Sequence, residues 1–182
     1  QSLNNISWER LESESAVTYP CDSIDEPGHD IIFSNGFPTP TQRGKFVPAS
    51  IIPPDEMPDS NYPLILTTGR QLEHWHTGAM TRRSSVLDEI EPEAIGCMAP
   101  LDLEERGISP GDDIIVSTRR GEIIVKARAD SGIPIGVIFV PFCYAESPAN
   151  ILTNPVLDPF GKIPEFKFCA AQVNPTDLSA AE

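Results

Sequence analysis

The alternation of apolar and polar residues is regular only in the second part of the chain. Two runs rich in β-branched residues, 113–118 and 122–129, flank an Arg-Arg-Gly turn at 119–121. Two such runs around a short glycine-containing turn predict an antiparallel hairpin. Apolar runs at 62–68 and 137–142 predict two further buried strands. The arginine pair at 119–120 is expected to be a solvated turn without a catalytic role.

A short helix and a tight turn precede this hairpin. The segment Pro100–Gly107 has acidic residues near its start and a glycine at its end, which predicts a two-turn helix that stops at Gly107. The Pro110-Gly111 pair then predicts a tight turn. A helix, a turn and a hairpin in this order suggest a small closed β-barrel, which leaves no exposed sheet edge, although periodicity alone also allows a β-sandwich. The expected fold is therefore mainly β with short helices.

The first sixty residues lack this regularity and are rich in proline and glycine turn signals. One short helix is expected within Asn4–Leu11, capped by Asn5 or Ser7 and anchored by Trp8. We therefore expect three parts along the chain. Residues 1–60 form an irregular arm or connector, residues 61–175 form the β-barrel and residues 176–182 form a tail.

Composition narrows the class of protein. The 182 residues carry a formal net charge of −14, which argues against nucleic acid or an anionic membrane surface as the main partner. No apolar run approaches the roughly 20 residues that a membrane-spanning helix needs. The chain begins with Gln1 rather than Met, so we interpret it as part of a larger protein. Its first residues therefore say little about the cellular compartment of the parent protein.

The four cysteines, Cys21, Cys97, Cys143 and Cys169, are far apart and form no Cys-x-x-Cys pair. This spacing predicts no zinc or iron–sulfur site within the chain. We expect reduced, partly buried structural thiols, as in a cytoplasmic protein. A disulfide bond is the alternative.

The strongest chemical signal lies directly after the first predicted strand. The fourteen residues 70–83 contain three arginines, two histidines and a tryptophan in an otherwise acidic chain. Local arginines and backbone N–H groups can bind an anion even in an acidic protein, so this loop is expected to attract one. The alternative is a solvated loop whose aromatic residues pack on the barrel. His74 and His76 could form half of a zinc site, but no further ligand has useful spacing, so no metal site is expected.

Two later segments are weaker candidates. The segment 142–154 follows a predicted strand and continues into an expected short helix, whose first N–H groups could face an anion. The segment 158–171 contains an aromatic residue and a lysine close together. The alternatives are an ordinary strand-to-helix connection and an ordinary strand lysine.

Three separated motifs in these segments resemble one known family. Leu66-Thr-Thr-Gly-Arg70, His74-Trp-His-Thr-Gly-Ala-Met-Thr-Arg82 and Pro164-Glu-Phe-Lys-Phe-Cys-Ala170 are similar to motifs of the C-terminal molybdopterin-dinucleotide-binding domain of the dimethyl-sulfoxide-reductase family. Within that family the chain most resembles the catalytic subunit of formate dehydrogenases, with nitrate reductases as near relatives. The resemblance implies a double-psi β-barrel, and the segment 37–46 resembles the connector that leads into it.

The resemblance also implies which residues bind the cofactor. These are Arg70, Gln71, Leu72, His74, Trp75, His76, Thr77, Thr81, Arg82, Phe142, Asn150, Phe166 and Lys167. The arginines would neutralise phosphate charge, the tryptophan and Phe142 would pack against rings, and Thr81 and Asn150 would orient the ligand through hydrogen bonds. Family members often carry tyrosine where Phe166 stands, so a hydroxyl contact would be lost there.

The implied activity is oxidation of formate to carbon dioxide with bis-molybdopterin guanine dinucleotide carrying molybdenum or tungsten. The family places the metal ligand and a four-iron cluster in earlier domains, so we expect this chain alone to be inactive and to hold no catalytic residue. Its partners would be the remaining domains of the same subunit and electron-transfer subunits. Three alternatives remain: the same domain of a nitrate reductase, a stand-alone molybdopterin-binding or assembly subunit, and a mainly structural interface.

Overall fold

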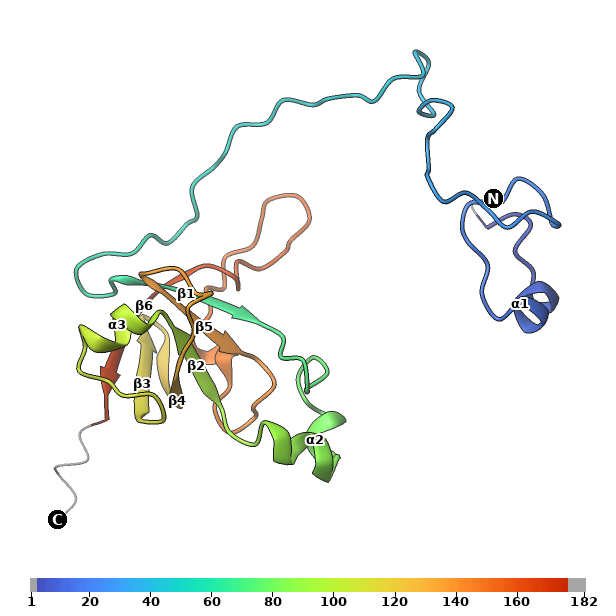
Figure 1. Cartoon of the computed structure of the whole chain (residues 1–182). Helices are drawn as coiled ribbons and strands as arrows, with labels where there is room; N and C mark the ends of the chain where they lie inside the picture. Colours follow the sequence, from blue (N-terminus) through green and yellow to red (C-terminus); the bar gives the residue numbers. More distant parts are fainter. Residues whose placement is uncertain (1–2, 177–182) are drawn as a thin grey trace. The chain divides into compact units, whose positions relative to one another are not determined.

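The computed structural model describes residues 3–176 and divides the chain into two compact units, Gln1–Ile51 and Ile52–Glu182. Within the described residues, the first unit contains one helix, α1 (Trp8–Glu14), and the second contains every strand (Figure 1). The segment 52–60 therefore belongs to the same unit as the barrel. No helix in the described part of the chain is long and apolar enough to cross a membrane.

The first unit is organised around a buried arginine. Ser7 caps α1 by accepting a hydrogen bond from the Arg10 N–H, as one of the two predicted caps. The Arg10 guanidinium is buried and donates to the carbonyl oxygens of Asn5, Ser23 and Glu26. The prediction that Trp8 anchors this helix is wrong, because its side chain is 81% exposed. Arg10 takes that place because neighbouring carbonyl groups satisfy its donors.

The second unit is a closed barrel of six strands in the order β1-β5-β2-β4-β3-β6. The strands are β1 (Leu64–Gly69), β2 (Ile95–Met98), β3 (Asp113–Thr118), β4 (Gly121–Ala129), β5 (Val137–Pro141) and β6 (Cys169–Pro175). Short helical elements connect them: η1 (Thr81–Arg83), α2 (Ser85–Ile90), α3 (Pro100–Glu104) and η2 (Ala149–Ile151). The predicted mainly β class with a closed barrel and short helices is confirmed.

The predicted hairpin is β3 and β4, which pair antiparallel around a two-residue loop at Arg119-Arg120. Alternate residues of β3 point inward, so Ile114 and Val116 are fully buried while their neighbours are partly exposed. Their cross-strand partners Val125 and Ile123 are buried on the same face. The predicted hairpin is therefore present, and its register is the one that buries both apolar sets.

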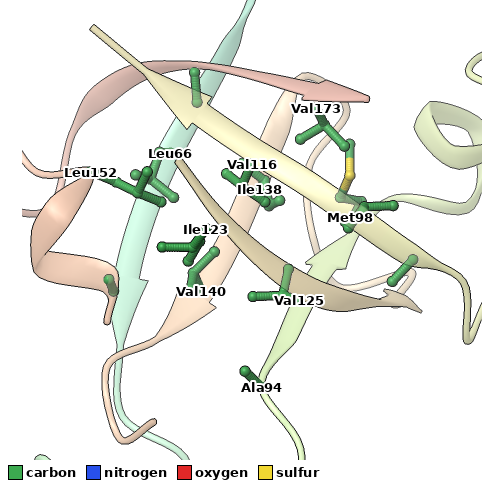
Figure 2. Close-up of a cluster of buried hydrophobic side chains, with 14 of the residues drawn as sticks. Leu66, Ala94, Met98, Val116, Ile123, Val125, Ile138, Val140, Leu152 and Val173 are labelled. Atoms are coloured by element: carbon green, nitrogen blue, oxygen red, sulfur yellow. The ribbon is translucent and has the colours of Figure 1, made fainter. Parts of the chain in front are cut away.

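The barrel interior is an apolar cluster to which every strand contributes (Figure 2). Leu66 of β1, Ile138 and Val140 of β5 and Met98 of β2 have almost no exposed surface. Cys143 and Cys169 belong to this cluster, and all four cysteines of the chain, including Cys21 of the first unit, are buried and free. Burial raises the pKa of the Cys97, Cys143 and Cys169 thiols, so these thiols are protonated and inert at neutral pH.

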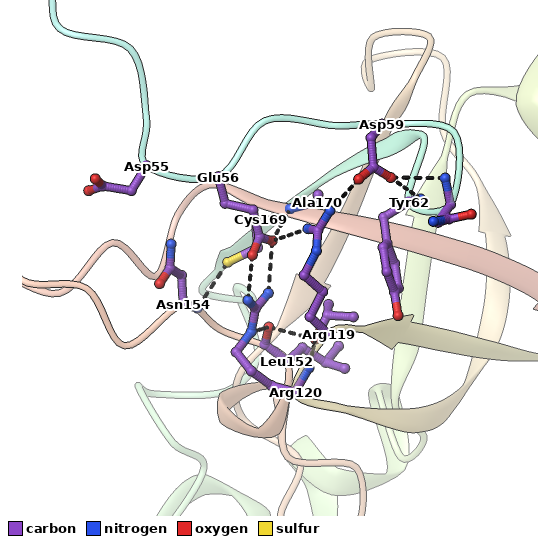
Figure 3. Close-up of polar contacts among 12 residues, drawn as sticks. Asp55, Glu56, Asp59, Tyr62, Arg119, Arg120, Leu152, Asn154, Cys169 and Ala170 are labelled. Atoms are coloured by element: carbon purple, nitrogen blue, oxygen red, sulfur yellow. Dashed lines mark hydrogen bonds and ion pairs between the residues drawn. The ribbon is translucent and has the colours of Figure 1, made fainter.

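The hairpin tip is not the solvated turn that the sequence predicted. Arg120 makes a two-point ion pair with Glu56, with N–O distances of 2.6 and 3.0 Å, and Arg119 pairs with Asp59 (Figure 3). Sequence distance hid these contacts, since the carboxylates lie about sixty positions earlier in the segment that leads into β1. The arginine pair thus holds that segment against the barrel.

Candidate functional site

Two of the three predicted loops leave the barrel side by side. β1 and β5 are parallel neighbours, with Gly69 paired to Pro141 at their carboxyl ends. The Phe142 N–H continues the pairing by donating to the Gly69 carbonyl at 3.1 Å. The loops that begin at residues 70 and 142 therefore start from one barrel edge, as is common for ligand loops on parallel strands.

A buried histidine organises the first loop. His74 is 1% exposed, and its Nε2 lies 2.8 Å from the Glu91 carbonyl oxygen while its Nδ1 lies 3.3 Å from Thr81 Oγ1. A carbonyl can only accept, so Nε2 carries the hydrogen and Nδ1 accepts from the Thr81 hydroxyl. The same hydroxyl oxygen accepts the Trp75 N–H at 3.0 Å. His74 and Thr81 therefore fix the loop conformation, and their direct contact with a cofactor stays a prediction.

Tyr144 is an organising residue that was not predicted from the sequence. Its ring is buried and meets His74 edge-to-face, with ring centroids 5.8 Å apart. Its hydroxyl lies 3.1 Å from the Glu91 carbonyl oxygen and 3.2 Å from Gln71 Oε1. Burial raises the pKa of Tyr144, so it stays neutral. The only sequence signal was its position two residues after Phe142, in a loop that begins at a buried strand.

Glu91 joins this cluster to the barrel wall. Its carboxylate accepts two hydrogen bonds from Arg128 of β4, at 3.0 and 2.8 Å. The Arg128 guanidinium holds the pKa of Glu91 below its ordinary value. The Glu91 carbonyl that receives His74 and Tyr144 is therefore fixed by an ion pair on the same residue.

The two loops touch at a glycine. Gly78 has a φ of +73°, and a Cβ added there would lie 2.5 Å from the Cys143 carbonyl oxygen and 2.6 Å from Arg82 Cγ. Only glycine combines this backbone conformation with such close approach. Gly78 therefore sets the spacing between the loops that begin at residues 70 and 142.

Arg82 is surrounded by acceptors of the protein itself. Its guanidinium forms ion pairs with Asp88 at 2.9 Å and Glu146 at 2.8 Å, and donates to the Pro92 carbonyl at 2.9 Å. It also lies 4.7 Å from the centroid of the Tyr144 ring. Two carboxylates offset its charge, so Arg82 should attract a phosphate less strongly than a free arginine would. Its contact with phosphate stays a prediction.

Arg70 has a different environment. It is exposed, and its Nη2 donates to His76 Nε2 at 2.9 Å, which makes this ring nitrogen an acceptor and leaves the pair with a net positive charge. The guanidinium lies 5.7 Å from the centroid of the Trp75 ring, which itself meets His76 edge-on. Within residues 3–176 Arg70 forms no ion pair. This cation is available to an external anion.

Arg70 and Gln71 line two clefts on this surface. One, of about 610 Å³, also includes Trp75 and Leu87, and the other, of about 400 Å³, includes Arg128 and Phe139. Each volume lies within the range of about 300–1,000 Å³ that is usual for small-molecule sites. Leu72 and Thr77 are exposed on the same loop.

The closing segment reaches the same end of β1. Lys167 donates from Nζ to the Thr68 carbonyl at 2.7 Å, and the Thr68 hydroxyl donates to the Phe166 carbonyl at 2.8 Å. The Lys167 ammonium lies 5.4 Å from the centroid of the Phe166 ring. Both predicted residues of this segment thus lie beside the strand end that leads into Arg70.

Asn150 and Phe142 are placed differently. Phe142 is half-buried and packs against the apolar core, while Asn150 is exposed on η2, which rests against the β3–β4 hairpin. The short helix expected in this segment is the three-residue 3-10 turn η2, and the contact of its first N–H groups with an anion stays a prediction. His74 and His76 also do not converge, since the first ring is buried against Glu91 and the second pairs with Arg70.

These residues fit a ligand that combines phosphate with flat rings. Arg70 supplies an available cation, Trp75 supplies an aromatic face that is 58% exposed, and Lys167 adds a second positive charge at the end of β1. Gln71 Nε2 is a buried donor that has no hydrogen-bond partner among the described residues. No group of three potential metal ligands occurs within residues 3–176. The surface is therefore equipped for binding and orientation.

Comparison with known proteins adds independent information. The family described as "Molydopterin dinucleotide binding domain" matches residues 64–170. The chain is 46% identical over 169 residues to the F420-dependent formate dehydrogenase 1 subunit alpha of Methanococcus maripaludis, and 41% identical over 168 residues to the F420-dependent formate dehydrogenase subunit alpha of Methanocaldococcus jannaschii. Each alignment covers 92% of this chain and 25% of the relative, so the chain spans about a quarter of these relatives.

A solved structure supports the fold. Acetylene hydratase from Pelobacter acetylenicus is similar with a TM-score of 0.58 and 20% sequence identity, over 63% of this chain and 18% of that one. At this identity the likeness concerns the fold alone. Together with the family match, it confirms the resemblance that the three sequence motifs indicated.

Proposed function

Because the chain belongs to the molydopterin dinucleotide binding domain family, we propose that its barrel holds the guanine dinucleotide part of a bis-molybdopterin cofactor. Such a ligand joins a pyrophosphate to two flat ring systems, so it needs cations and aromatic faces. Arg70 would bind phosphate through its fork of N–H donors, and Trp75 would pack against a ring. His76, which accepts from Arg70 at 2.9 Å, would hold the guanidinium in place.

The contrast between two arginines carries this proposal. Arg82 shares its charge with Asp88 and Glu146, whereas Arg70 contacts only the neutral acceptor His76 and the Trp75 ring. A phosphate that approached Arg82 would compete with carboxylates already in place. A phosphate that approached Arg70 would meet a cation that forms no ion pair among the described residues, beside two clefts that Glu73 also lines. Arg70 is therefore the principal phosphate contact of the first loop.

We further propose that the chain is the C-terminal domain of a formate dehydrogenase catalytic subunit. The support is its identity of 39–46% to formate dehydrogenase alpha subunits, which favours formate over nitrate as the substrate. When bound, the molybdenum or tungsten centre would supply the two-electron oxidation of formate to carbon dioxide. The residues of this chain would bind and orient the cofactor, while metal ligands and a four-iron cluster would belong to other parts of the subunit.

The surroundings of the domain are proposed on the same basis. Residues 1–60 would connect it to the preceding domain, with 52–60 packed in the same unit as the barrel. Residues 61–175 would form the binding unit and residues 176–182 a tail. The remaining domains of the subunit would cover the exposed loop, and the "subunit alpha" in the names of the relatives supports an electron-transfer partner subunit. Four free buried cysteines support a reducing, cytoplasmic compartment.

One comparison on the full-length protein tests the proposal. The purified protein is assayed with formate and with nitrate, and the nucleotide released by acid hydrolysis is identified. We expect formate oxidation and the release of GMP. Nitrate reduction without formate oxidation would refute the substrate, and absence of a guanine nucleotide would refute the cofactor.

A further inference from the structure

The tip of the β3–β4 hairpin holds the main chain directly after Asn150. Arg120 donates from Nε to the Leu152 carbonyl at 2.9 Å, and the Thr118 hydroxyl donates to the same oxygen at 3.0 Å. A Cβ added at Gly121 would lie 2.5 Å from Ile151 Cγ2, so the tip and η2 are in direct contact. The carbonyl two residues after Asn150 is therefore fixed by the hairpin.

Arg120 is itself held in one orientation. Glu56 accepts from both terminal nitrogens of the guanidinium, at 2.6 and 3.0 Å, and also accepts the Ala170 N–H at 2.8 Å (Figure 3). The side chains of both Arg120 and Glu56 are largely buried, at 21% and 13% exposed. A planar guanidinium held at both terminal nitrogens has little freedom left at Nε. Glu56 thus fixes the orientation in which Arg120 Nε donates to the Leu152 carbonyl.

The end of this loop is fixed from a second side. The Asn154 N–H donates to Cys169 Sγ at 3.1 Å, and Asn154 Nδ2 donates to Glu165 at 3.0 Å. The Asp55 N–H donates to the same Glu165 carboxylate at 3.2 Å. The segment before β1, the closing segment and the loop that contains Asn150 are therefore joined in one polar network, while Asn150 itself stays exposed.

We propose that Arg120 is a positioning residue for the cofactor, acting through the Leu152 carbonyl to hold Asn150 against the dinucleotide. This inference rests on the proposed function, in which Asn150 contacts that ligand. Arg120 lines neither cleft beside Arg70, so it acts without touching the ligand from that side. Its effect depends on a three-way geometry that a single-point cation cannot reproduce.

The neighbouring arginine provides a matched control. Arg119 pairs with Asp59, lies 4.8 Å from the centroid of the Tyr62 ring and also approaches Glu56, at 3.4 Å. None of its side-chain hydrogen bonds in the described structure reaches the loop that contains Asn150. Arg119→Lys and Arg120→Lys are the same chemical change at adjacent positions of one turn. Both variants keep a cation beside the acidic segment, so both are expected to fold.

The experiment measures cofactor loss from the full-length holoenzyme. Wild type, Arg120→Lys, Arg119→Lys, Asn150→Ala and the double variant Arg120→Lys/Asn150→Ala are incubated and desalted at timed intervals. Protein-bound GMP is then quantified after acid hydrolysis, and thermal unfolding of each variant is recorded. We expect Arg120→Lys to lose cofactor about 10-fold faster than wild type, the low end of the effect of removing a supporting contact. We expect Arg119→Lys to stay close to wild type.

The double variant distinguishes positioning from general destabilisation. If Arg120 acts through Asn150, Arg120→Lys adds no further loss in the Asn150→Ala background. Additive effects, or equal loss from Arg119→Lys and Arg120→Lys, would overturn the positioning role while leaving the cofactor assignment intact. If Asn150→Ala alone leaves cofactor loss unchanged, the proposed Asn150 contact fails and the positioning role fails with it.

Discussion

Gly78→Ala should be unusually destabilising because it forces apart the two loops of the candidate site. Gly78 has a φ of +73°, a conformation that costs a residue with a Cβ about 1–2 kcal/mol. The new methyl group would also lie 2.5 Å from the Cys143 carbonyl oxygen, which is main chain and cannot rotate away. Overpacking of this kind typically costs about 1–3 kcal/mol. We therefore expect a loss of about 2–5 kcal/mol in the free energy of unfolding.

Gly107→Ala is the matched control for the backbone term. Gly107 has a φ of +65°, and nothing lies within 4 Å of an added Cβ. Its substitution should therefore cost only the conformational part, about 1–2 kcal/mol. Urea unfolding of both variants is followed by circular dichroism. If the slope of the unfolding free energy against urea concentration is unchanged, the two curves give the difference directly. Equal losses in the two variants would show that the loops do not touch at Gly78, and the described geometry of the site would be wrong.

Three further predictions concern the network, the core and the loop. The Arg120 hydrogen bonds lower the pKa of Glu56, so its contribution to stability is full above its ordinary pKa of about 4.3 and is lost as pH falls toward the lowered value. Urea titrations should accordingly show a gap between wild type and Glu56→Gln that is constant at neutral pH and closes below about pH 4; a gap that widens in acid would contradict the ion pair. Leu66→Ala should cost about 2–5 kcal/mol in the same assay, since Leu66 is fully buried in the barrel, and a loss below about 1 kcal/mol would contradict that packing. His74→Phe should free the Thr81 hydroxyl and remove one of the two donors to the Glu91 carbonyl, so amide hydrogen exchange at Trp75 should accelerate; unchanged exchange would show that His74 does not order the loop.

Part of the barrel could be predicted from the sequence because the signals for its hairpin and turns lie within short stretches of the chain. The β-branched runs of β3 and β4 around a glycine-containing turn predicted the hairpin, and the turn before β3 predicted where it begins. Closure by β6 between β1 and β3 was not derivable from alternation, since it depends on pairings across most of the barrel. The named resemblance supplied that part.

The sequence identified the candidate loop, but it did not distinguish the different environments of its residues. The loop 70–83 was found because its cations and aromatic residues stand out in an acidic chain. The difference between Arg70 and Arg82 depends on Asp88 and on Glu146, a carboxylate 64 positions away, which no local pattern shows. The same holds for His74, whose partner is a main-chain carbonyl seventeen positions later, and for Arg120 with Glu56. Contacts between distant segments determine which candidate side chains hold the loops and which stay available for the proposed ligand.

The most direct test compares Arg70→Ala with Arg83→Ala in the full-length protein. Both arginines are exposed and lie on the same loop, but only Arg70 lines the two clefts. The measurement is the GMP released per protein molecule by acid hydrolysis after purification. We predict a marked loss of bound nucleotide in Arg70→Ala and a wild-type level in Arg83→Ala. Wild-type nucleotide content in Arg70→Ala would contradict the proposal that this loop binds the dinucleotide through Arg70.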